Sequence, residues 1–73
     1  MELKQGMLYQ ADVTLSFLES MASNNIIADK LRLAGFSNVI VTGKGNTRNA
    51  TGYWNLPSQK VELPKQVSNV KLV

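Results

Sequence analysis

Residues 39–54 read VIVTGKGNTRNATGYW, in which an apolar run, Val39–Val41, leads into the loop Gly43–Asn49 and then toward Tyr53-Trp54. Glycine and asparagine tolerate the positive φ angles that a tight reversal needs, and β-branched or aromatic residues favour strands on both sides of it. The pattern predicts a β-hairpin whose tip carries two cations, Lys44 and Arg48.

The segment Tyr9–Phe17 alternates strictly between apolar odd positions and polar even positions. A period of two is typical of a strand with one buried face and one face in water. We therefore predict a strand here, with Tyr9, Val13 and Phe17 facing the core and Asp12 facing solvent or a polar partner.

A short helix is predicted over Ile26–Ala34. Ser23, Asn24 and Asn25 are all residue types that cap a helix N-terminus, and Gly35 is placed to end the helix in a left-handed conformation. Ile27, Leu31 and Ala34 fall on one face, which we expect to cover the sheet.

The order strand, helix, strand leaves enough chain for a crossover between two parallel strands. Lys60–Leu63 alternates again, Pro64 favours an edge position, and Val67–Val73 offers a last short strand. We predict one compact α+β domain over residues 1–73, a β-α-β-β-type unit with one helix packed on a mixed sheet of three to five strands.

Composition limits the possible chemistry. The 73-residue chain has no cysteine and no histidine, which excludes disulfides and the usual pairing of base and nucleophile. Its carboxylates are scattered over different predicted elements, and the spacing of Gly43-Lys44-Gly45 does not match a nucleotide-binding loop. We expect a protein that is not an enzyme and has no cofactor and no metal.

The charge is unevenly distributed along the chain. Residues 1–40 hold three basic and four acidic side chains, a net charge of −1, whereas residues 41–73 hold five basic and one acidic, a net charge of +4. No apolar run approaches the roughly 20 residues that span a bilayer. We expect synthesis in the cytoplasm, no membrane insertion, and possible incorporation into a larger particle.

A chain of this size buries only about 60% of its unfolded surface, so its stability benefits from a partner. A terminal strand offers unpaired backbone groups to a neighbouring chain. We therefore predict a protein–protein interaction module, a small structural subunit of an oligomer or of a larger, virion-like assembly. The expected partner contacts are Lys44 and Arg48 at the hairpin and Val70, Lys71, Leu72 and Val73 at the end of the chain.

Binding of single-stranded nucleic acid is the alternative. Cations follow phosphates and an exposed aromatic ring stacks on a base. Because neighbouring strand residues point to opposite faces, only one of Tyr53 and Trp54 can lie on a face that binds nucleic acid. We expect the single tryptophan in the core. The residues of this alternative are Lys44, Arg48, Tyr53 and Lys60.

Overall fold

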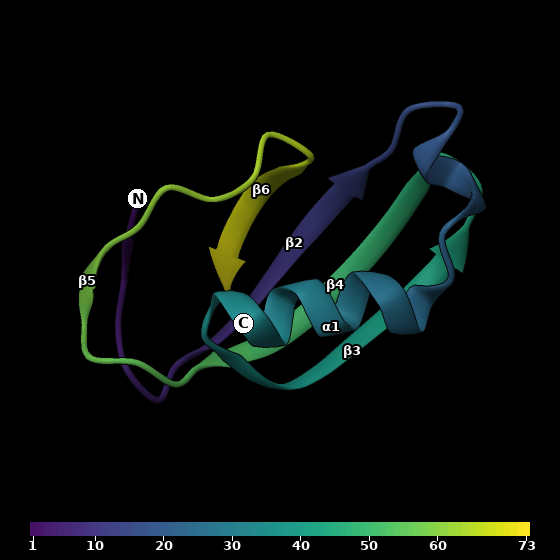
Figure 1. The fold of residues 1–73 in the computed structure, drawn as a ribbon. Coiled ribbons are helices and arrows are strands. Elements are labelled where there is room, and N and C mark those ends of the chain that lie inside the picture. The colour runs from purple at the N-terminus through teal and green to yellow at the C-terminus, as the bar shows by residue number, and fades with distance from the viewer.

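The computed structural model describes residues 1–73, and one helix lies across one face of a four-stranded sheet (Figure 1). The elements in chain order are β1 (Glu2–Leu3), β2 (Leu8–Thr14), the 3-10 turn η1 (Glu19–Met21), α1 (Asn24–Ala34), β3 (Phe36–Lys44), β4 (Thr47–Trp54), β5 (Gln59–Lys60) and β6 (Val67–Leu72). The predicted α+β class and its single helix are confirmed.

The strand order of the large sheet is β3-β4-β2-β6, and every neighbouring pair is antiparallel. The prediction of a mixed sheet was wrong in this respect. β2 precedes α1 along the chain and β3 follows it, and these two strands do run in the same direction. They are not neighbours in the sheet, because β4 lies between them and pairs with both. A second, two-stranded antiparallel sheet joins β1 to β5 at one end of the molecule (Figure 1).

β2 is the central strand that the alternation predicted, with Tyr9 and Val13 buried. It ends three residues earlier than expected. The Leu15 amide donates to the Asn46 carbonyl at 2.7 Å, and the chain then turns through Ser16, whose amide donates to the Glu19 carboxylate. Phe17 is consequently 81% exposed, which corrects its assignment to the core.

α1 ends at Ala34 as predicted and begins at Asn24, two residues before the predicted start. The Ser23 side chain accepts a hydrogen bond from the Ile26 amide and caps the N-terminus. Gly35 follows the last turn with φ of 123°, a conformation that L side chains rarely adopt. Ile27 and Ala28 are buried against the sheet, whereas Ala34 is exposed.

β3 and β4 form the predicted hairpin, with a shorter turn than expected. Lys44 pairs with Thr47, so only Gly45 and Asn46 lie in the turn. Gly45 has φ of 74°, and glycine at the first position of a two-residue loop matches the right-handed twist of the strands. The seven-residue loop of the sequence analysis is therefore mostly strand.

The core consists of two clusters on the helix side of the sheet. Val13, Leu15, Ile27 and Ala50 form one, and Leu3, Tyr9 and Trp54 form the other. Trp54 is 1% exposed, stacks edge-on against Phe36 with ring centroids 5.1 Å apart, and donates its indole N–H to the Pro57 carbonyl. Its assignment to the core is confirmed.

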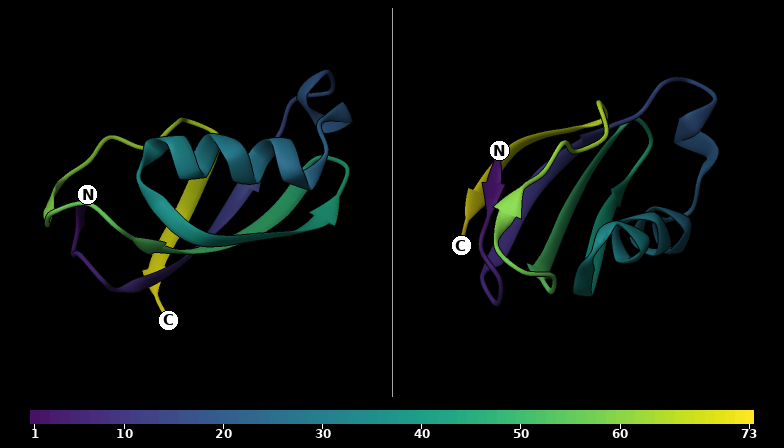
Figure 2. Two further views of the ribbon diagram at one scale, coloured as in Figure 1. Left: turned by 60° about the horizontal axis from the view of Figure 1, so that its bottom comes forward. Right: turned by 60° about the vertical axis from the view of Figure 1, so that its left-hand side comes forward.

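The two faces of the four-stranded sheet differ in what packs on them. α1 packs on one face of the sheet, chiefly against β3, while no helix or strand covers the opposite face, here called the open face (Figure 2). The open face is polar along most of its length because β2 and β4 point alternate residues to it: Gln10, Asp12, Thr14, Thr47, Asn49 and Thr51.

Candidate interaction surfaces

The terminal strand β6 lies at the edge of the sheet. It pairs with β2 on one side only, through Gln10 with Lys71 and Asp12 with Ser68. In an antiparallel ladder, successive residues direct their backbone groups alternately toward and away from the partner strand. The Val73 amide donates to the Leu8 carbonyl, which fixes the phase of this ladder and leaves the backbone N–H and C=O of Leu72 directed outward.

The side chains of this edge are also accessible. Leu72 is 52% exposed and Val73 is 72% exposed, and Lys71 is on the open face opposite Gln10. Val70 is different, because it is half-buried against the Tyr9–Trp54 cluster. The structure therefore brings three of the four predicted terminal residues to one accessible edge and turns the fourth into the core layer.

A bulge lies in the middle of β6. The register shifts opposite Ala11, and Asn69 there has φ of 54°, while its side-chain Nδ2 donates to the Asp12 carboxylate at 2.9 Å. Beside it, an open hollow of about 470 Å³ is lined by Met1, Val61–Leu63 and Val67–Val70. The part of β6 beyond the bulge is consequently the freer part of this edge.

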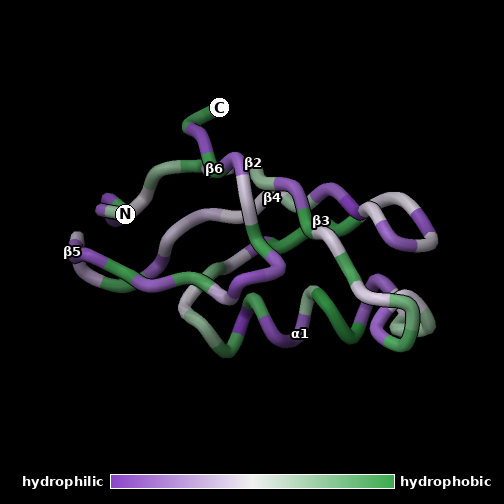
Figure 3. Tube along the Cα trace, turned by 90° about the horizontal axis from the view of Figure 1, so that it is seen from above, coloured by the Kyte–Doolittle hydropathy of each residue, from purple (hydrophilic) through white to green (hydrophobic).

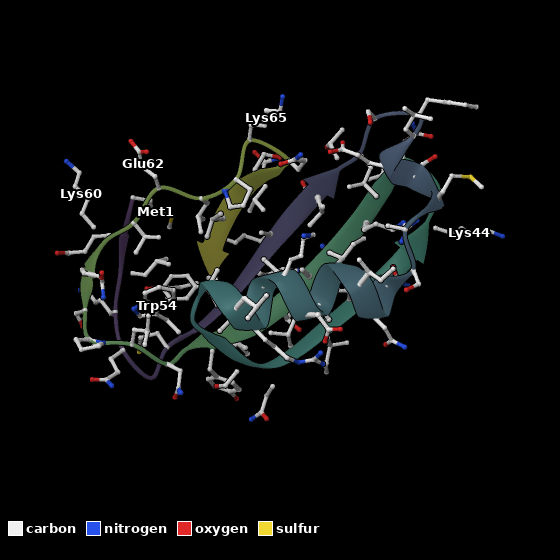
Figure 4. All side chains as sticks on the ribbon, viewed as in Figure 1. Met1, Lys44, Trp54, Lys60, Glu62 and Lys65 are labelled. Atoms are coloured by element: carbon white, nitrogen blue, oxygen red, sulfur yellow. The ribbon has the colours of Figure 1, made fainter.

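The hairpin tip separates the two cations that the sequence placed together. Lys44 is exposed at the end of β3 (Figure 4). Arg48 is only 5% exposed, because it shares the inward-facing positions of β4 with Ala50, Gly52 and Trp54. The assignment of Arg48 as a partner or nucleic-acid contact is therefore corrected, since its guanidinium does not reach the surface.

Arg48 links three segments inside the molecule. Its Nε donates to the Gly45 carbonyl at 3.0 Å, Nη1 to the Asn24 side-chain oxygen at 2.7 Å, and Nη2 to the Ser20 carbonyl at 2.9 Å. No carboxylate pairs with it, since the only ion pair in the structure joins Asp29 to Arg32. A buried cation is thus held entirely by neutral acceptors that come from η1, α1 and the hairpin.

The residues of the nucleic-acid alternative are also dispersed. Tyr53 is on the open face between Ser37 and Leu8 and is exposed, as the strand geometry predicted. Lys44 is at the far end of the same face. It pairs with Thr47, which is six strand residues from Tyr53, a separation of about 20 Å. Lys60 belongs to the small sheet at the opposite end of the molecule (Figure 4). Only Lys44 and Tyr53 share a face.

An exposed apolar patch lies on the helix side, and sequence reasoning missed it. Phe17, Leu18 and Met21 are 80–84% exposed around η1, and Ile26 and Leu33 are exposed along α1. Figure 3 shows several hydrophobic segments, in green, along α1. One signal was available, because a Phe-Leu pair where the alternation stops cannot direct both side chains into one core.

A groove borders this patch. It runs between α1 and the segment Pro64–Val67, has a volume of about 230 Å³, and is floored by Val13, Leu15 and Val67. Ile26 of the patch forms part of its wall, and Glu19 and Lys30 stand at its rim. The groove exists because α1 covers only part of the sheet, and no second helix fills the rest of the layer.

Glu19 ties η1 to the strand side of the groove. Its carboxylate accepts from the Ser16 backbone N–H at 2.9 Å and from the Gln66 amide at 2.7 Å. These hydrogen bonds hold the pKa of Glu19 below its ordinary value of 4.5. The groove wall is thereby fixed to the segment that precedes β6.

Nowhere do three or more histidine, cysteine or acidic side chains gather as metal ligands would. No helix in the chain is long and apolar enough to cross a membrane. No family model, curated protein or solved structure matches this chain.

Proposed function

We propose that this chain is a non-enzymatic protein–protein interaction module that self-associates, as a small structural subunit of an oligomer or of a larger, virion-like particle. The observation that carries the proposal is the unpaired edge of β6 beyond its bulge. Leu72 offers a backbone donor and acceptor there, and exposed apolar side chains flank them.

Edge strands of this kind pair with other chains through main-chain hydrogen bonds. Two copies related by a twofold axis would place β6 antiparallel to β6 and merge their four-stranded sheets into one. Lys71 does not oppose this pairing, because its side chain projects from the open face and not from the edge.

The experiment is the solution mass of the purified chain by light scattering over a range of concentrations. We expect multiples of 8.0 kDa for the natural sequence. Leu72→Pro removes the outward-directed N–H and leaves the bonds to β2 intact, so it should lower the mass. Leu72→Val keeps the N–H and serves as the matched control.

Two outcomes would contradict the proposal. A natural chain that stays at 8.0 kDa at every concentration would rule out self-association. A multimer that Leu72→Pro and Leu72→Val leave equally unchanged would rule out the β6 edge as the contact.

The second candidate function is binding of single-stranded nucleic acid on the open face. It is favoured by one observation, that exposed Tyr53, Lys44 and Lys71 all project from this face. Such binding would weaken steeply as salt rises. Fluorescence anisotropy of a labelled oligonucleotide at low and moderate salt tests it, with Tyr53→Leu as the variant that removes stacking. Equal anisotropy with and without the protein at low salt would eliminate this candidate.

A further inference from the structure

The exposed apolar patch and the groove beside it form a self-complementary surface. We infer that two copies of this chain dock through this surface, with Phe17 of each copy entering the groove of the other. The inference rests on the proposed self-association and identifies a second contact surface for it, separate from the edge of β6.

The size of the patch supports a partner protein. A fully exposed large apolar side chain presents about 150–200 Å², so the four side chains at the η1 end of α1, Phe17, Leu18, Met21 and Ile26, together present on the order of 500 Å². A standard interface buries about 800 Å² per partner, whereas monomers rarely expose contiguous apolar patches beyond a few hundred Å². The patch therefore supplies more than half of the area that one side of a standard interface buries.

The charges around the patch favour a protein over an anionic surface. Residues 17–33 contain two acidic and two basic side chains, and one of each is already joined in the Asp29–Arg32 pair. The remaining two, Glu19 and Lys30, have opposite signs and stand at the rim of the same groove. Because both signs of charge lie at one groove, a twofold axis can bring the Glu19 of one copy toward the Lys30 of the other, and the same favourable pair then forms twice.

The shape of the surface indicates a second copy as the occupant. A twofold interface requires that one patch carry both the projecting and the receiving part. Here Phe17 and Leu18 are exposed immediately before η1, and Glu19, the next residue along the chain, lines the groove. An apolar cavity of about 150 Å³ already holds benzene, so a groove of about 230 Å³ has room for a phenyl ring.

The first test compares two substitutions of the same kind. In a chain whose β6 contact is blocked by Leu72→Pro, Phe17→Ser should raise the dissociation constant of the remaining dimer at least about tenfold, because a buried aromatic anchor dominates such contacts. Ile40→Ser removes an exposed apolar side chain from β3, away from the patch, and should leave the constant unchanged. Both positions are exposed, so both variants should fold. Equal effects of the two substitutions would overturn the inference.

The second test uses the absence of natural cysteine. A Leu18→Cys chain is mixed with a Lys30→Cys chain under mild oxidation, and the control mixture replaces Lys30→Cys with Lys60→Cys. We expect a disulfide-linked heterodimer from the first mixture and little from the second. Similar yields from both mixtures would overturn the inference.

The two proposals fail in different ways. A natural chain that is monomeric at all concentrations would refute the proposed function itself. A chain that associates, responds to Leu72→Pro, and ignores Phe17→Ser would leave the proposed function standing and refute only this surface.

Discussion

Arg48 shows how one residue can determine the local architecture. Its guanidinium is buried and satisfied by Asn24, Ser20 and Gly45, so shortening it leaves those acceptors unpaired. Unpaired buried polar groups cost about 1–3 kcal/mol each. We predict that Arg48→Ala lowers the free energy of unfolding by about 2–4 kcal/mol, measured by urea unfolding.

Lys44→Ala is the matched control for Arg48→Ala. Lys44 is exposed on the same hairpin and forms no ion pair, so its loss should change the free energy of unfolding by less than about 0.5 kcal/mol. Equal losses at the two positions would show that Arg48 is not the buried link between η1, α1 and the hairpin.

Glu19 makes a prediction about pH. Its pKa is lower in the folded chain than its ordinary value of 4.5, so its contribution to stability is complete above that value and is lost as pH falls through the folded pKa. We predict that Glu19→Gln reduces the stability lost between pH 7 and pH 3, measured by urea unfolding at both pH values.

Glu62→Gln is the control for Glu19→Gln. It removes a carboxylate without disturbing the contacts with Ser16 and Gln66. If the two variants respond identically to acid, the hydrogen bonds of Glu19 do not contribute to the acid dependence.

Residue roles were predictable where strand geometry alone decides them. Tyr53 and Trp54 are adjacent on β4, and their separation between open face and core follows from alternation. Arg48 has the same parity as Trp54, so the same rule places it inside. The sequence suggested otherwise because Gly43–Asn49 resembled a loop, in which parity has no meaning.

At the scale of elements, the joint between α1 and β3 is unusually tight. A Cβ on Gly35 would lie 2.7 Å from Leu56 Cδ1 and 2.9 Å from Trp54 Cζ3, in addition to the strain of its positive φ. We predict that Gly35→Ala costs about 2 kcal/mol or more in the free energy of unfolding, measured by thermal or urea unfolding.

Substitution of Gly45 distinguishes the effect of crowding by a Cβ from the effect of a positive φ. Gly45 also has a positive φ, but a Cβ there meets nothing within 4 Å. Gly45→Ala should therefore cost about 1 kcal/mol, from backbone strain alone. If it cost as much as Gly35→Ala, crowding at the joint would not be the cause.

The predicted elements differ in how local their causes are. α1 was predictable because its cap at Ser23 and its stop at Gly35 act within a few residues. The end of β2 was not, because the Leu15 amide bonds to Asn46 far along the chain. Hydrophobic alternation continued to Phe17 in the sequence, but the hydrogen-bond partners that a strand needs did not.

At the scale of the whole molecule, the edge of β6 and the exposed apolar patch are different surfaces of one small chain. A subunit with two separate twofold contacts does not close as a dimer but continues into larger assemblies. We predict that the mass of the natural chain rises beyond the dimer with concentration, whereas Leu72→Pro and Phe17→Ser each stop at the dimer. Light scattering measures this, and a natural chain that saturates as a dimer would contradict it.

The strand order of the sheet could not be predicted from local patterns. The sequence indicated where strands occur, but the insertion of β4 between β2 and β3 depends on which residues pair over long separations. The same limit applies to the candidate surfaces. The apolar patch and the groove form where η1, α1 and Pro64–Val67 come together, and no short stretch of sequence predicts that these segments are neighbours.

The central place of β2 also governs how the chain reaches its native state. β2 is synthesised early, whereas both strands that flank it, β4 and β6, are synthesised much later. The backbone N–H and C=O groups of β2 therefore remain unpaired until those strands are available. Folding that depends on such distant pairings proceeds in milliseconds to seconds, slower than in helical bundles. During synthesis, a strand with one apolar face and two open edges is therefore the part of this protein that most needs protection from neighbouring chains.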